Sequence, residues 1–184
     1  MQVRDTNKDR RSIGVLAIVC AVVQLAVSPN IGFGAGRANI ALVFAGIVAL
    51  SIGGRTGVLT GFLAGLFYDM TTTGPIGLMA LLLTVCSYVL GTEERNRLAD
   101  DPTSSLALFA IADFAVCLAY HVTMLLVGQA SSLIDALIVR TLPTFVLTLV
   151  AYLIFSYFLT RGPGGGASTP RGSRGGSHYS LGKL

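Results

Sequence analysis

The stretch GVLTGFLAGLFYDM, residues 57–70, repeats a small residue at every fourth position inside an apolar run. Glycine stands at Gly57, Gly61 and Gly65, and the next position in the same register is a carboxylate, Asp69. Four residues advance an α-helix by about 400°, so these positions form one slowly drifting stripe. A stripe of small residues is a groove along which another helix can approach closely. The stretch therefore predicts a helix that packs through this face, either within a bundle or against a partner.

The composition of the whole chain indicates the solvent in which this helix packs. The 184 residues are 53% hydrophobic and 12% charged, with a mean hydropathy of +0.72, which is too apolar for a water-soluble domain. A membrane-spanning helix needs about 20 mostly apolar residues. The candidate spans are 13–27, 39–52, 56–70, 76–90, 106–127 and 133–159. We therefore predict an all-α integral membrane protein, a six-transmembrane-helix bundle over residues 13–160.

Basic residues predict the orientation of the bundle. With the N-terminal segment 1–12 in the cytoplasm, 11 of the 13 lysines and arginines fall on inner segments, leaving only Arg37 and Arg140 on or near the outer side. The positive-inside rule then places both termini in the cytoplasm. The tail 161–184 is basic and rich in glycine and serine, so we expect it to be disordered and weakly attracted to anionic lipid. Nucleic acid is not an expected partner.

The carboxylate of Asp69 needs a partner in such a protein. A charge at the centre of a membrane helix costs about 2.5–3.5 kcal/mol, so it should face the bundle interior, water or a partner. Arg140 reaches a similar depth from the outer side, at about 1.5 Å of helix rise per residue. An ion pair between Asp69 and Arg140 is one hypothesis, with Asp135 as a competitor for the arginine. The alternative is that both side chains extend separately to the outer interface.

The fifth candidate span carries a second group of polar side chains. Asp113, Cys117, Tyr120 and His121 fall within about 80° of one another on a helical wheel. Such groups suit either a proton relay or a metal site, or interhelical hydrogen bonds. We favour hydrogen bonds, because the predicted spans contain a single histidine. In the last span, Pro143 is expected to kink the helix.

Cysteine usage gives no indication of a cofactor. Cys20, Cys86 and Cys117 lie in different predicted spans, without a CxxC or Cys/His cluster. We therefore expect neither a disulfide framework nor a metal site. The sequence shows no nucleophile with a neighbouring base, no paired acids and no phosphate loop. We therefore predict no catalytic residues.

The region that follows the glycine stripe completes a recognisable pattern. Gly74, Pro75 and Gly77 predict a tight outer turn that begins the next helix, and that helix closes on Tyr88-x-x-Gly91 before a basic loop. The whole pattern, residues 57–91, resembles that of the rod shape-determining protein MreD family.

The resemblance implies a non-enzymatic protein of the bacterial inner (cytoplasmic) membrane. Such a protein would be a scaffold of the rod (elongation) complex, maintaining cell shape and supporting lateral peptidoglycan synthesis. Its partners would be MreC and, through MreC, the actin-like MreB filament and the peptidoglycan polymerase and transpeptidase, besides membrane lipid. Pairing of two copies to form a homodimer is left open.

A second resemblance gives the alternative function. Small six-helix bundles also serve as substrate-binding subunits of energy-coupling-factor vitamin transporters, and the Ala17-x-x-x-Ala21 face of the first span is similar to their docking motif. This would imply an outward vitamin pocket with polar and aromatic walls. The chain has no tryptophan and few polar residues in its predicted outer halves, so we favour the scaffold.

Overall fold

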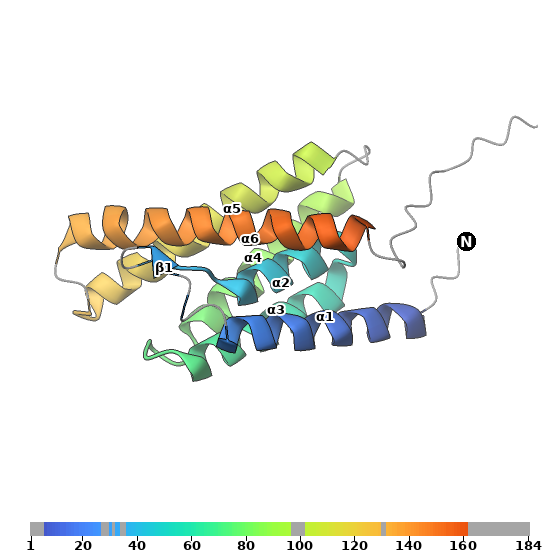
Figure 1. Cartoon of the computed structure of the whole chain (residues 1–184), viewed down its shortest axis with the longest axis horizontal. Coiled ribbons are helices and arrows are strands. Elements are labelled where there is room, and N and C mark those ends of the chain that lie inside the picture. The colour runs from blue at the N-terminus through green and yellow to red at the C-terminus, as the bar shows by residue number, and fades with distance from the viewer. Residues whose placement is uncertain are drawn as a thin grey trace, which may run out of the picture.

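The computed structural model describes residues 6–26, 30, 32–33, 36–96, 102–129 and 132–161, so the predicted tail falls outside the described residues except for its first position. The described elements are α1 (Thr6–Ala26), β1 (Gly32–Phe33), β2 (Gly36–Arg37), α2 (Ile40–Ser51), α3 (Gly54–Thr71), α4 (Leu78–Asn96), α5 (Pro102–Leu126), the π-helical segment η1 (Asp135–Thr141) and α6 (Leu142–Arg161). The start of α1 and the end of α6 lie at the same end of the bundle (Figure 1).

Helix α2 is the centre of the bundle. Every residue from 40 to 49 is buried, and α1, α3, α4 and α6 all pack against it. Asn39 caps the helix, because its side-chain oxygen accepts a hydrogen bond from the N–H of Leu42 at 3.1 Å. After α2, Gly53 and Gly54 adopt φ angles of +60° and +58°. These left-handed conformations suit glycine and reverse the chain directly into α3.

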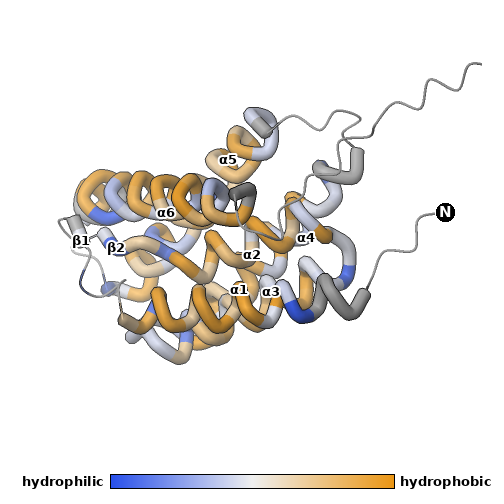
Figure 2. Tube along the Cα trace, turned by 45° about the vertical axis from the view of Figure 1, so that its right-hand side comes forward, coloured by the Kyte–Doolittle hydropathy of each residue, from blue (hydrophilic) through white to orange (hydrophobic). Residues whose placement is uncertain are grey.

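The outer surface of the bundle is apolar and its interior contains polar groups. Leucine, isoleucine and valine side chains are exposed along α1, α3, α4, α5 and α6, and Figure 2 shows hydrophobic residues over most of the helical length. The buried polar residues are Gln24, Asn39, Asp69, Ser87, Asp113, His121, Thr141, Thr144 and Thr148. Exposed apolar surface of this extent is unfavourable in water, whereas lipid solvates it and polar groups then collect inside.

Two helices have the length and hydropathy of a membrane span, over Thr103–Leu126 and Ile138–Leu159. The helices at Arg11–Ala26, Ile40–Ser51 and Leu78–Glu93 are apolar but shorter. The all-helical class is thus as predicted, apart from the short antiparallel hairpin of β1 and β2. The number of spans and the side on which the termini lie stay predictions.

The last predicted span is helical over residues 133–161 and contains a π-helical segment before Pro143. The chain follows a π-helical path through η1 and becomes α-helical at Leu142, so Pro143 is the second residue of α6. Proline lacks an N–H and its ring crowds the carbonyl four residues earlier. The chain is helical without a break across Pro143, and the wider π-helical turns of η1 lie where the ring crowds the preceding carbonyls.

Candidate functional site

The glycine stripe of α3 faces inward. Gly57 lies against the backbone of α2, whereas Gly61 and Gly65 lie against α4. A Cβ atom placed on Gly61 would be 2.8 Å from the carbonyl oxygen of Leu83, and one placed on Gly65 would be 2.5 Å from Cα of Ala80. Neither distance leaves room for a side chain. The stripe is therefore occupied within the chain, and a second copy could not pack on it without displacing α4.

Gly91, the last glycine of the motif, also packs against backbone. A Cβ on Gly91 of α4 would lie 3.2 Å from Cα of Gly53, in the turn between α2 and α3. Gly91 thus lets α4 pass directly over this turn. Tyr88, one helical turn earlier, is 64% exposed and borders a surface groove together with Arg55. Gly91 borders the same groove, so both ends of the Tyr-x-x-Gly pattern adjoin it, although only Tyr88 is exposed.

Asp69 joins the end of α3 to the start of α4. Its side chain is 1% exposed, and its carboxylate accepts hydrogen bonds from the N–H groups of Gly77 at 2.9 Å, Met79 at 3.1 Å and Ala80 at 3.1 Å. The first N–H groups of a helix have no intrahelical partners, and a negative charge there is favourable. These amides are the hydrogen-bond partners of Asp69 in the described part of the chain, and the ion pair with Arg140 stays a prediction. Asp69 is a helix cap.

The turn before α4 makes this cap possible. Gly77 has a φ of +96°, a conformation that side-chain-bearing residues rarely adopt. The N–H of Leu78 donates a hydrogen bond to the carbonyl of Pro75 at 3.3 Å. Gly74 passes close to α5, since a Cβ there would lie 2.6 Å from the hydroxyl oxygen of Tyr120. The three motif residues thus direct the amides at the start of α4 toward Asp69.

The polar stripe predicted on α5 is buried as one face. Asp113, Cys117, Tyr120 and His121 are all less than 10% exposed. Cys117 Sγ donates to Asp113 Oδ1 at 3.3 Å, and His121 Nδ1 lies 2.9 Å from the carbonyl oxygen of Cys117 and 3.1 Å from Thr141 Oγ1 in η1. Part of the stripe therefore bonds along α5 and part bonds across to the next element. Among the described residues, no group of three potential ligands could hold a metal ion.

Three residues of that stripe also form one wall of a small polar pocket. The pocket has a volume of about 100 Å³. Its lining residues come from β2, the α2 cap, α3, α4, α5 and α6: Arg37, Asn39, Tyr68, Met79, Cys117, Tyr120, His121 and Thr144. Asp113 lies one turn before Cys117 on α5 and does not line the pocket. The pocket brings Arg37 to the α5 stripe, an association that sequence separation alone does not reveal.

Two threonines on α6 were not singled out from the sequence, although their four-residue spacing in an apolar helix was a usable signal. The N–H of Arg37 donates to Thr144 Oγ1 at 3.3 Å, and the N–H of Asn39 donates to Thr148 Oγ1 at 3.0 Å. Non-helical backbone inside a membrane protein needs such partners, because lipid offers none. The two hydroxyl groups thus accept hydrogen bonds from backbone N–H groups of the segment that leads into α2.

Thr148→Val is expected to lower the free energy of unfolding by about 1–3 kcal/mol, because it leaves the buried N–H of Asn39 without its acceptor. Thr148 is fully buried, and valine preserves its shape. Thr123→Val is a matched control, since the Thr123 hydroxyl donates only to Ala119 O of its own helix at 2.8 Å. Thermal unfolding in a mild detergent measures both, and equal losses would contradict the assigned role of Thr148.

The comparison with protein families bears on the whole bundle. A family model described as rod shape-determining protein MreD matches residues 10–161, from within α1 to the end of α6. The chain belongs to the MreD family. This membership makes it a membrane protein of the rod complex, concerned with cell shape. Searches of curated proteins and of solved structures gave no match.

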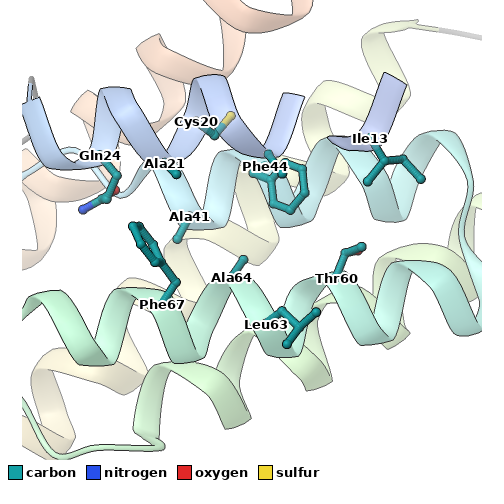
Figure 3. Close-up of a pocket in the computed structure, with 11 residues that line it drawn as sticks. Ile13, Cys20, Ala21, Gln24, Ala41, Phe44, Thr60, Leu63, Ala64 and Phe67 are labelled. Carbon is teal, nitrogen blue, oxygen red and sulfur yellow. The ribbon is translucent and has the colours of Figure 1, made fainter. Parts of the chain in front are cut away.

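This MreD-family bundle also has an apolar groove between α1 and α3, floored by α2. Its volume is about 360 Å³. Figure 3 shows side chains of α1 and of α3 on opposite sides, with Ala41 and Phe44 of α2 between them. Ala17 and Ala21 line the groove, so the small-residue face of the first predicted span borders it.

Proposed function

We propose that this chain is a non-enzymatic scaffold of the bacterial rod complex, spanning the inner membrane six times with both termini in the cytoplasm. It associates with MreC and, through MreC, with MreB and the peptidoglycan polymerase and transpeptidase, and so supports lateral wall synthesis. The observation that carries this proposal is the family match over residues 10–161. An even number of spans agrees with the common end at which α1 starts and α6 finishes (Figure 1).

The packing also suits a scaffold. Backbone contacts at the glycine stripe hold α2, α3 and α4 together, and Asp69 fixes the α3–α4 connection. Much of the polar chemistry therefore serves the fold itself, while the outer faces of the other helices remain apolar. A rigid centre with an apolar exterior can present transmembrane surface to a partner helix.

A mild-detergent pull-down of the tagged protein from its native host tests the proposal. Mass spectrometry should recover MreC and cell-wall synthases above the level obtained with an unrelated, equally tagged membrane protein. Recovery of ATPase subunits or a vitamin instead would favour the transporter subunit. The polar pocket of about 100 Å³ is below the roughly 300–1,000 Å³ usual for small-molecule sites, whereas the apolar groove of about 360 Å³ falls within that range, so the pull-down and not pocket volume separates the two functions.

Photo-crosslinking locates the partner surface. A crosslinking amino acid would replace one exposed apolar residue on each outer helix: Ile18, Leu63, Val85, Ile111 or Ile154. A specific scaffold contact predicts crosslinks to MreC from one face and not from the others. Equal crosslinking from all five positions would contradict a defined interface.

A further inference from the structure

The polar pocket is too small for a drug-sized ligand but large enough for a compact polar group. Its volume of about 100 Å³ corresponds to roughly three water molecules at about 30 Å³ each. Asn39, Tyr120, His121 and Thr144 in its walls are less than 10% exposed. These side chains come from separate elements and converge on one space. The pocket is a built site rather than an irregularity of the surface.

Hydrogen-bond donors dominate its walls. Asn39 Oδ1 is used by the helix cap, which leaves the Nδ2 group, and this group contacts Met79 Sδ at 3.6 Å. Thioether sulfur is only a weak acceptor, so the amide keeps donor capacity. Tyr68 and Tyr120 also line the pocket, and their rings meet edge to face with centroids 6.0 Å apart. The hydroxyl of Tyr120 is hydrogen-bonded to the side chains of Tyr68 and Thr72, so the tyrosines are already engaged within the protein. A ligand with acceptor oxygens matches the amide donor that remains.

The charged side chain in the lining is a cation. Arg37 lies on β2 at the pocket, and its backbone N–H is bonded to Thr144. Over the described part of the chain, its guanidinium group has no hydrogen-bond or ion-pair partner. The nearby carboxylates do not line the pocket: Asp69 is held by three amides, and Asp113 is bonded to Cys117. Arg37 is thus available for an anion.

His121 is compatible with the same ligand. Its Nδ1 lies 2.9 Å from the carbonyl oxygen of Cys117, and a carbonyl can only accept, so Nδ1 carries a hydrogen. This leaves Nε2 as the ring nitrogen without a hydrogen bond among the residues described. Nε2 accepts a hydrogen bond in the neutral ring and donates one in the protonated ring, so it can bind either a protonated or an ionised phosphate oxygen.

We propose that this pocket binds a single phosphate group, held by the guanidinium fork of Arg37 with Asn39 Nδ2 as a further donor. Arginine pairs with phosphate through two parallel hydrogen bonds, which gives both strength and orientation. The group belongs either to a phospholipid headgroup or to free phosphate. This site is independent of the scaffold proposal, because no partner protein contributes to it.

Two measurements on the purified full-length protein test the site. In a nonionic detergent without phospholipid, inorganic phosphate is titrated at constant ionic strength while the unfolding midpoint is followed. In parallel, native mass spectrometry counts phospholipids that remain bound after purification. The variants are Arg37→Gln and, as a matched control, Arg11→Gln, which removes an exposed arginine from α1. Because the Arg37 side chain is exposed, we expect Arg37→Gln to fold normally.

Stabilisation by inorganic phosphate would identify free phosphate as a ligand, and retention of one additional phospholipid would identify a headgroup. In either case the effect should persist in Arg11→Gln and weaken about tenfold or more in Arg37→Gln, as expected for a lost charge-assisted bond. Equal behaviour of the two variants would overturn the proposal. So would the absence of both effects in the unaltered protein.

Discussion

Gly65→Leu will lower the unfolding midpoint of the bundle far more than a leucine placed on its outer surface. The Cβ alone would lie 2.5 Å from Cα of Ala80 and 2.6 Å from the carbonyl oxygen of Met79. Both atoms belong to the backbone of α4, so no rotamer change relieves the overlap. Overpacking of a core costs about 1–3 kcal/mol or more, and the larger values are expected here because two helices must separate.

The chain supplies its own probe and control for this experiment. It has no tryptophan, but Cys20, Cys86 and Cys117 are free and buried, so a thiol-reactive fluorogenic dye reports unfolding. Gly14→Leu is the matched variant, because nothing lies within 4 Å of a Cβ at Gly14. It should leave the midpoint nearly unchanged. A Gly65→Leu protein as stable as this control would refute the close approach of α3 and α4.

Asp69→Ala is the second substitution with a large expected effect. It removes the acceptor of three N–H groups at the start of α4, and each unsatisfied backbone group in a lipid environment costs several kcal/mol before relaxation. Asp69→Asn should be milder, because its amide keeps one acceptor oxygen. The order of unfolding midpoints, unaltered above Asn above Ala, checks this role, and equal midpoints for all three proteins would contradict it.

The same position distinguishes the cap from the ion pair predicted from the sequence. If the backbone amides are the partners of Asp69, Asp69→Asn and Arg140→Gln should destabilise independently, and their effects should add within about 0.5 kcal/mol. If the double variant is no less stable than the worse single variant, the two residues are coupled, and this result would support the ion pair. Unfolding free energies of the four proteins of the cycle provide the measurement.

The glycine period shows how much of the helix packing could be predicted from the sequence. A four-residue period fixes which face of a helix is small, so close packing along Gly57, Gly61 and Gly65 was predictable. It does not name the neighbour, because the identity of α2 and α4 depends on turns elsewhere. The need to satisfy Asp69 was equally predictable. The backbone amides that the following turn directs toward Asp69 were not predictable, because they depend on the conformation of that turn, and the pairing with Arg140 stays a prediction.

Other features depended on tertiary structure that has no local sequence signal. The α5 stripe could be predicted because its members share one helix, whereas the polar pocket joins it to Arg37 through the β1–β2 hairpin. Pro143 indicated distortion in the last span, but not that a π-helical segment would precede it. Sequence periodicity describes one element at a time, and these features arise between elements.

The short length of helix α2 affects how the protein responds to the thickness of its bilayer. Its 12 residues extend about 18 Å, well short of the roughly 30 Å hydrocarbon layer. Since residues 40–49 are all buried among neighbouring helices, little of this shortfall is presented to lipid. Changes in acyl-chain length act on the long outer helices, which can tilt, whereas the geometry around α2 is set by protein alone. The centre of the molecule is therefore insulated from variation in membrane thickness.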